Sequence, residues 1–495
     1  MTRLYTWKLL LPALTLLLIT SCGQEEEASV AIPLSTESEE AREAYLQGLE
    51  ALDYGRQDDA RMYFDSAIEA DPDFAIAYFY RARVANSAEE WKRLTDFALQ
   101  NRTGASAAEQ MMIDMLPMYM KDDREMILEQ TKDLVDAYPE SPRVRLSLAA
   151  AYDGVGDIAQ KRAAIEKAIA LDETFAPAHR MMATSMIFDD PTDYALAEEH
   201  AGRYVELQPE EADAHIVLGD TWRAQSQLEK AREAYGKAIE VDPSHPTAYS
   251  KRGHANTFLG SYDEARADFE QAIDHAIGMM KISSANFGVY TFIYAGDLDA
   301  ALRANTAVTD GLPGMLADDG AQRQARISCL RDRVHIAAAA GDFDAAREAF
   351  ADHAELQREV ISIMNSPELT ASTEAELVVL EGWTAAREGD LESAMMHADR
   401  AAELLAEINN PRKLEGVHAL KGYAMLQTGD AKTAIEHFDQ SSQGWITVTF
   451  YRARAEEALG NDDRAQELYR EVANWNFNSL WYAFIRGEAV AKIQG

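Results

Sequence analysis

The residue types that most often carry catalysis or bind metals are few and scattered in this chain. Its 495 residues include 11 histidines and 2 cysteines. The histidines lack an acidic or cysteine partner at the spacing of a zinc site, as for His200, His215, His254, His335 and His418. The sequence has no phosphate-binding loop and no H-E-x-x-H, G-x-S-x-G or EF-hand pattern. We therefore expect a protein that is not an enzyme and that uses no cofactor or metal.

Two isolated features look chemical but have simpler structural explanations. Residues 154–159 match the pattern G-x-G-x-x-A. A dinucleotide-binding fingerprint must follow a strand, whereas the residues before Gly156 are predicted to be helical. Cys329 lies on a helix predicted over residues 322–338, and we expect Cys22, the other cysteine, to be modified and so not available to pair with it. Burial in the core is favoured over a redox function for this thiol.

The charge of the chain restricts the classes of partner. Asp and Glu number 84 against 47 Lys and Arg, and the formal net charge is -37. Nucleic-acid binding needs clustered basic residues, so this balance argues against a nucleic-acid partner. It also argues against electrostatic docking on anionic lipid. Two cysteines in a chain of this length exclude a disulfide-stabilised scaffold.

The first residues have the organisation of a signal peptide. Arg3 and Lys8 are basic, and residues 9–19 are apolar. This stretch is shorter than the roughly 20 residues that a membrane-spanning helix needs, so a cleaved signal is predicted over residues 1–21. The sequence Ile19-Thr20-Ser21-Cys22 resembles a bacterial lipobox. An ordinary secretory signal with a chance cysteine is the alternative.

The lipobox resemblance implies that Cys22 becomes the lipidated first residue of the mature chain and binds it to a membrane. Residues 22–40 would then be the lipidated cysteine and a flexible acidic tether. Gly23 stands where an aspartate would favour the inner membrane, so the resemblance implies the bacterial outer membrane. Residues 24–27, Gln-Glu-Glu-Glu, resemble a surface-export signal but also fit a solvated linker. Whether the chain faces the periplasm or the cell surface stays open.

A repeat of 34 residues organises most of the remaining chain. Residues 212–245 align with residues 246–279, which places Gly219 and Gly253 34 positions apart. Ala231 and Ala265 keep the same spacing. Small residues at these positions are expected where two helices cross closely. Aromatic side chains such as Tyr235 are expected to fill the space beside them.

These positions resemble the tetratricopeptide-repeat family. The resemblance implies an all-α fold, a solenoid of stacked antiparallel helix pairs that coils into a superhelix. We expect about eleven units, divided into an N-terminal array over residues 41–277 and a looser C-terminal array over residues 278–472. Loops are predicted at residues 309–320 and 365–373, where the repeat spacing lengthens. Residues 473–495 are predicted to form a capping helix, although their aromatic side chains also suit a docking surface.

The family resemblance also implies a ligand groove lined by the first helix of each pair. The positions that face this groove carry Arg180, Arg223, Lys251 and His254, which are the candidate ligand contacts. Some family members hold a peptide carboxylate with Lys and Asn at such positions, but Thr184 and Val217 replace the asparagines here. Ion pairing of these cations with neighbouring acids is the alternative.

The sequence thus favours a non-enzymatic, lipid-anchored scaffold that binds a protein or peptide partner in its concave groove. The alternative is a surface glycan- or small-ligand-binding lipoprotein associated with an outer-membrane importer. That class carries fewer repeats and more irregular, aromatic-rich sequence than this chain. The identity of the partner and the oligomeric state stay open.

Overall fold

The computed structural model describes residues 32–494, and every regular element in this range is a helix. Consecutive helices pack against one another in pairs, as the repeat predicts. The predicted all-α fold of stacked helix pairs is therefore confirmed. The signal peptide and Cys22 lie outside the described residues.

The described residues form twelve helix pairs and one final helix. The seven N-terminal pairs are α2 (Glu39–Asp53) with α3 (Gln57–Ala70), α4 (Ala75–Arg83) with α5 (Ala88–Asn101), the short α6 (Ala107–Ile113) and α7 (Leu116–Met120) with α8 (Arg124–Ala137), α9 (Pro142–Val155) with α10 (Ile158–Leu171), α11 (Ala176–Phe188) with α12 (Tyr194–Leu207), α13 (Ala212–Ala224) with α14 (Leu228–Val241), and α15 (Pro246–Phe258) with α16 (Tyr262–His275). A 3-10 turn, η1 (Arg102–Gly104), follows α5.

The five C-terminal pairs include longer helices. They are α17 (Met279–Tyr294) with α18 (Leu298–Met315), α19 (Asp319–Ala340) with α20 (Phe343–Met364), α21 (Pro367–Glu388) with α22 (Leu391–Leu404), α23 (Glu415–Thr428) with α24 (Ala431–Phe438), and α25 (Ile446–Ala458) with α26 (Asp462–Asn474). The final helix is α27 (Leu480–Gln494).

The loops predicted at the lengthened repeats are mostly helix, so that prediction was wrong. Residues 309–315 are the last turns of α18, with Pro313 inside the helix and the side chain of Leu312 fully buried. Residues 367–373 begin α21, whose first residue is Pro367. Proline suits the first turn of a helix because no intrahelical donor is lost there. The added residues therefore lengthen the helices, and α19, α20 and α21 each span 22 residues.

The glycine positions of the repeat lie at close helix crossings, as predicted. A Cβ on Gly219 would lie 2.5 Å from a ring carbon of Tyr235, and one on Gly253 would lie 2.8 Å from Phe269. Both aromatic rings are almost fully buried. The glycine on the first helix and the aromatic ring on the second therefore lock the helices of these two pairs together.

The Gly-Asp turns between paired helices also follow the sequence. Gly341 has φ +80°, a left-handed conformation that glycine adopts without steric cost. The side chain of Asp342 then caps α20 by accepting a hydrogen bond from the backbone N–H of Ala345. The same sequence of turn and cap precedes α18, α22 and α24.

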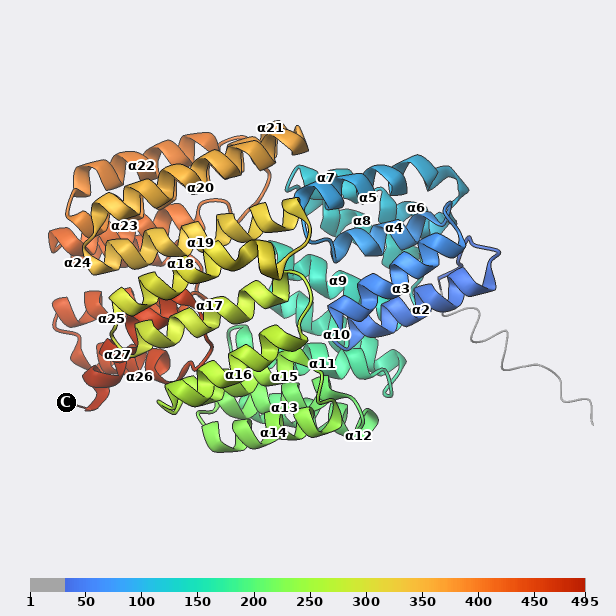
Figure 1. Cartoon of the computed structure of the whole chain (residues 1–495), viewed down its shortest axis with the longest axis horizontal. Helices are drawn as coiled ribbons and strands as arrows, with labels where there is room; N and C mark the ends of the chain where they lie inside the picture. Colours follow the sequence, from blue (N-terminus) through green and yellow to red (C-terminus); the bar gives the residue numbers. More distant parts are fainter. Residues whose placement is uncertain (1–31, 495) are drawn as a thin grey trace, which may run out of the picture.

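The first helices form the inner layer of the stack. From α11 to α25, the first helix of each pair contacts the first helix of the next pair, whereas contacts between successive second helices are weaker or missing among the described residues. The first helices therefore lie on the tighter, concave side of the curve. Figure 1 shows the pairs winding from α2 through α15 to α27.

The stack curls until distant pairs meet. Ser366, just before α21, donates a hydrogen bond to the backbone oxygen of Met120 at the end of α7 (3.0 Å). Asn410 Nδ2 donates to Asp122 Oδ2 (2.7 Å). At the other end, α27 packs on α17, where Figure 1 shows the two helices together. Contacts between helices far apart in the chain therefore close the stack at both places.

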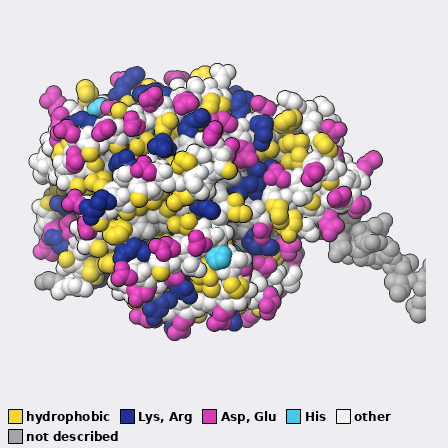
Figure 2. Space-filling model, in the orientation of Figure 1, with side chains coloured by type: hydrophobic (Ala, Val, Ile, Leu, Met, Phe, Trp, Pro, Cys, Tyr) yellow, Lys and Arg dark blue, Asp and Glu magenta, His cyan; other side chains and the backbone are white. Residues whose placement is uncertain are grey.

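The surface matches the acidic composition. Figure 2 shows Asp and Glu side chains scattered over the visible face, among basic and apolar ones. The negative charge is thus spread over solvent-facing positions, where it favours solubility. None of the helices in residues 32–494 combines the length and hydrophobicity that crossing a membrane requires.

Candidate functional site: two cavities on the concave side

A cavity of about 740 Å³ opens among the inner helices of the C-terminal pairs. Its walls come from α19, α20, α21, α23 and α25, from the connections between them, from the segment before α27 and the first turn of that helix, and from Asp122 before α8. Four of the seven tryptophans of the chain line it: Trp383, Trp445, Trp475 and Trp481. We call it the tryptophan pocket. Its volume is typical of sites for small molecules or for a few side chains of a partner.

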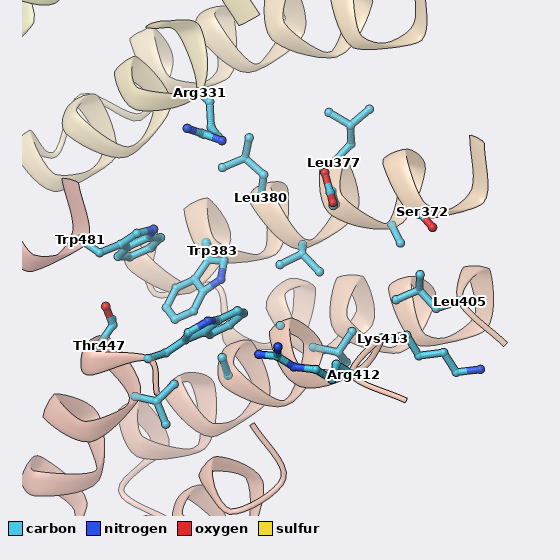
Figure 3. Close-up of a pocket in the computed structure, with 18 of the residues that line it drawn as sticks. Arg331, Ser372, Leu377, Leu380, Trp383, Leu405, Arg412, Lys413, Thr447 and Trp481 are labelled. Atoms are coloured by element: carbon cyan, nitrogen blue, oxygen red, sulfur yellow. The ribbon is translucent and has the colours of Figure 1, made fainter. Parts of the chain in front are cut away.

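The aromatic side chains of the pocket support one another. The indole rings of Trp383 and Trp481 have their centroids 5.1 Å apart at an angle of 57°, and Figure 3 shows both side chains in the pocket. The guanidinium of Arg387 lies 4.8 Å from the Trp481 ring centroid. Trp383 is buried, but the side chain of Trp445 is 44% exposed at the rim. Trp445 is thus available for contact with a ligand.

Basic side chains border the aromatic surface. In Figure 3, Arg331 lies on one side of the pocket and Arg412 and Lys413 on the other. Arg412 pairs with Glu415 (2.9 Å), and the ammonium of Lys413 donates to two backbone oxygens. Arg331 has only a 3.6 Å contact with Asp332, and its side chain is 55% exposed. Arg331 is therefore the basic group of this pocket that is least engaged within the chain.

Burial shifts the pKa values of three titratable side chains of the pocket toward their neutral forms. Burial lowers the pKa of His335 well below its usual value, and the charges of Arg387 and Arg331 lower it further. Burial also lowers the pKa of His353, whose Nδ1 lies 2.9 Å from the backbone oxygen of Ile327. Burial raises the pKa of Glu376, although Arg331 opposes that shift. The pocket therefore offers aromatic and cationic contacts more than acidic ones.

A second cavity, of about 520 Å³, lies among the inner helices α13, α15 and α17. Three of the four candidate ligand contacts line it: Arg223, Lys251 and His254. The segment between α26 and α27 forms one wall with Trp475, Phe477 and Asn478. We call it the cationic cavity. Trp475 lines both cavities, so the two adjoin at this residue.

Asp220 is the anionic partner at the cationic cavity. It accepts hydrogen bonds from Arg223 Nη2 (2.8 Å), Lys251 Nζ (2.6 Å) and the hydroxyl of Tyr235 (2.6 Å). Burial acts to raise the pKa of the Asp220 carboxyl, but Lys251 and Arg223 outweigh it and hold that pKa below its usual value. Burial lowers the pKa of Lys251, and the charge of Asp220 opposes that shift. The carboxylate thus stays ionised between two cations.

The other two candidates differ in surroundings. His254 packs edge-on against Phe287, with ring centroids 4.4 Å apart, and its Nδ1 lies 3.1 Å from Nδ2 of Asn478. Arg180 is not among the residues lining either cavity, and its Nε donates to Asp213 Oδ2 at 2.6 Å. Three of the four cations and histidines named from the sequence therefore share one cavity, and Arg180 lies apart.

Of the tryptophan pocket, the sequence predicts only Trp475 and Trp481, within the aromatic segment that also suits a docking surface. The tryptophans of the pocket fall on α21, before α25 and before and within α27, at no common repeat position. The available signal was composition, since four of seven tryptophans fall between residues 383 and 481. In the described part of the chain, no three His, Cys, Asp or Glu side chains converge in an arrangement that would hold a metal ion. The geometry of both cavities suits ligand binding.

Comparison with protein families finds the repeat in three segments. Residues 45–102 and 246–274 match models of the tetratricopeptide repeat, and residues 219–257 match a TPR repeat model. Two curated proteins are similar to part of the chain. They are the protein O-mannosyl-transferase TMTC1 of Mus musculus, 24% identical over 143 residues, and that of Homo sapiens, 23% identical over 204 residues. These alignments cover 28% and 40% of this chain but only 15% and 22% of those proteins.

Solved structures of similar fold include yeast Tom70 and MamA. Tom70 is 13% identical with a TM-score of 0.39, and the match covers 92% of this chain and 95% of that one. MamA is 25% identical with a TM-score of 0.28, and the match covers 34% of this chain and 94% of that one. The family models thus identify tetratricopeptide repeats in this chain, and its described residues form a stacked array of helix pairs of that kind.

Proposed function

We propose that the chain is a scaffold that binds a peptide segment of a partner protein in the tryptophan pocket. The observation that carries this proposal is the group of four tryptophans around one cavity of about 740 Å³. Tryptophan, tyrosine and arginine dominate the energetically important positions of protein interfaces. Arrays of this repeat bind peptides and proteins, and a preformed groove lowers the entropic cost of capturing an extended segment.

The lining of the pocket specifies the kind of segment. Trp383, Trp445 and Trp481 offer apolar surface to an aromatic or aliphatic anchor side chain. Arg331 lies beside them and has little pairing within the chain, so an acidic residue next to the anchor would complete its charge. We therefore expect a ligand with a large apolar residue followed or preceded by Asp or Glu.

A displayed library of random peptides, selected against the purified full chain, tests this proposal. Selected sequences are synthesised and their affinities measured by calorimetry. Trp445→Ala removes an exposed side chain of the pocket, and we expect about 5- to 30-fold weaker binding, since truncating an interface anchor costs about 1–2 kcal/mol.

Trp222→Ala provides the matched control. Trp222 is a half-buried tryptophan of α13 that bonds Glu198 and lines neither cavity. This variant is expected to bind like the wild type. Equal binding by the Trp445→Ala variant and the wild type, or failure to select any pocket-dependent peptide, would refute the proposal.

The same tryptophans favour a glycan as the second candidate ligand, because sugar rings stack their apolar faces on indole surfaces. A glycan array probed with the full chain and with its Trp445→Ala variant separates the two. Glycan binding that is lost in the variant, without peptide binding, would identify the chain as a carbohydrate-binding protein and exclude the peptide proposal.

We further propose that Cys22 carries the lipid that anchors the scaffold to the bacterial outer membrane. The support is the sequence Ile19-Thr20-Ser21-Cys22 after the apolar stretch. Cells expressing the wild type in medium with an alkyne-labelled fatty acid should yield a labelled chain in the outer-membrane fraction. A Cys22→Ser variant should be unlabelled. Equal labelling of both, or an unlabelled wild type, would contradict a lipid on this residue.

A further inference from the structure

The cationic cavity has a composition unlike the rest of the molecule. None of the residues that line it is Asp or Glu, although the chain has 84 acidic residues. Two cationic side chains line it instead, Arg223 and Lys251, together with the hydroxyls of Thr247, Ser250, Ser283 and Ser284. A cavity with cations and hydroxyl donors but without carboxylates is suited to an anion.

The charges around this cavity do not cancel. Arg223 and Lys251 share Asp220 as their ion-pair partner, so one positive charge is left over. Asp213 also acts on Lys251, but its charge is offset by Arg180, which bonds it at 2.6 Å, beside the hydroxyl of Tyr204 at 3.0 Å. His254 adds no negative charge, and its low pKa reflects burial and the field of the two cations. An uncompensated charge at a buried site is costly unless a counter-ion binds.

Arg223 also has unused hydrogen-bonding capacity. It is 1% exposed, and its Nε and Nη1 have no hydrogen-bond partner within the chain. The ring of Phe477 covers its guanidinium, with the ring centroid 4.5 Å from Cζ. The guanidinium therefore contributes mainly charge to the cavity, whereas Lys251 and the hydroxyls are placed to donate hydrogen bonds.

The remaining lining defines the other part of the ligand. Ser250 and Ser284 lie with their hydroxyl oxygens 2.9 Å apart, beside Lys251. Met279, Met280 and Phe287 supply apolar surface. One excess positive charge matches a monoanion better than a dianion such as a phosphate ester. The volume of about 520 Å³ suits a small molecule.

We propose that the cationic cavity binds a small organic monocarboxylate. Its carboxylate lies against Lys251 and the hydroxyls of Ser250 and Ser284. Its apolar part lies against Met279, Met280 and Phe287. This site is separate from the peptide site of the tryptophan pocket and does not depend on it.

Calorimetry on the purified full chain tests the proposal with octanoate and 3-phenylpropanoate. The matched neutral probes are octanamide and 3-phenylpropanamide. Inorganic phosphate is the third probe and tests whether the cavity prefers a phosphate anion to a carboxylate. We expect at least one acid to bind at least tenfold more tightly than its amide and more tightly than phosphate. Equal binding of acid and amide, tighter binding of phosphate, or no binding of either acid at millimolar concentration would overturn it.

Three variants locate the binding. Lys251→Gln should weaken binding of the acid at least tenfold, whereas Lys237→Gln, on the surface of α14, should leave it unchanged. If Lys251→Gln loses its helical circular dichroism, the double variant Ser250→Ala/Ser284→Ala takes its place, with several-fold weaker binding expected. The Trp445→Ala variant should bind the acid like the wild type. An acid that binds all variants equally does not occupy this cavity, and the proposal fails.

Discussion

The side-chain amide of Asn478 donates a hydrogen bond to Nδ1 of His254 across 224 positions of sequence, with 3.1 Å between the two nitrogens. An amide nitrogen can only donate here, so Nδ1 of His254 is an acceptor and carries no proton. Burial, reinforced by Arg223 and Lys251, lowers the pKa of His254 well below its usual value, in agreement with a neutral ring. This contact joins the C-terminal segment to the N-terminal array.

Acidification is expected to destabilise the closed stack. The pKa of His254 is lowered in the fold, whereas an unfolded histidine has a pKa of about 6.5. Below that value the unfolded chain therefore binds more protons than the folded one. The contribution of His254 to the free energy of unfolding is thus complete above pH 6.5 and is lost as the pH falls. His335 and His353, whose pKa values are also lowered, act in the same direction.

Thermal unfolding between pH 7.5 and 5.5 measures this effect. The melting temperature should fall less between pH 7.5 and 5.5 in His254→Gln than in the wild type. His215→Gln is the control, since the contact of this ring is an exposed one, from Nε2 to the backbone oxygen of Pro209. Identical pH dependence in His254→Gln and the wild type would show that His254 does not titrate on unfolding.

Gly219→Ala should destabilise the chain by about 1–3 kcal/mol, because the added methyl meets the ring of Tyr235 at 2.5 Å in a packed crossing. Gly236→Ala is the opposite case, since Gly236 lies inside α14 with nothing within 4 Å of the new Cβ. It should stabilise the chain by roughly 0.5–1 kcal/mol. Urea unfolding compares the two, and a Gly219→Ala variant as stable as Gly236→Ala would show that the crossing is not tight.

Asp220→Asn should lower stability by about 3–5 kcal/mol, because it leaves the buried Arg223 and the partly exposed Lys251 without their carboxylate. Glu240→Gln removes the partner of Lys237 in an exposed pair and should change stability by less than about 0.5 kcal/mol. Both values come from denaturant midpoints. Similar losses in the two variants would argue that Asp220 is effectively solvated.

Phe477→Ala should loosen the closure between the two arrays. The ring of Phe477 packs on Phe188 with centroids 4.4 Å apart and covers the guanidinium of Arg223. We expect a loss of about 3 kcal/mol, typical of truncating a buried phenylalanine, and a larger radius of gyration by solution X-ray scattering. Leu459→Ala, at a side chain that is 47% exposed, is the control. An unchanged radius in Phe477→Ala would mean that other contacts hold the arrays together.

The sequence by itself determined the local structure of this protein. The spacing of Gly219, Tyr235 and their counterparts predicts the helix pairs and their crossings, because these contacts join residues within one repeat. The Gly-Asp turns and their caps are likewise local. The glycine- and proline-containing stretch before Leu316 misled the loop prediction, because proline near a helix end does not stop a helix whose inner face, at Leu312, is buried.

Only the tertiary structure decided which distant residues meet. Each helix pair is rotated slightly relative to its neighbour, and these rotations add up to the curvature of the stack. The sequence of one repeat does not determine this total curvature. That curvature brings Asp122 to Asn410 and Asn478 to His254. The two cavities exist because of this closure, since Trp475 and its neighbours wall both of them. The sequence alone therefore names the groove residues Arg223, Lys251 and His254, and the curvature of the whole chain decides what they face.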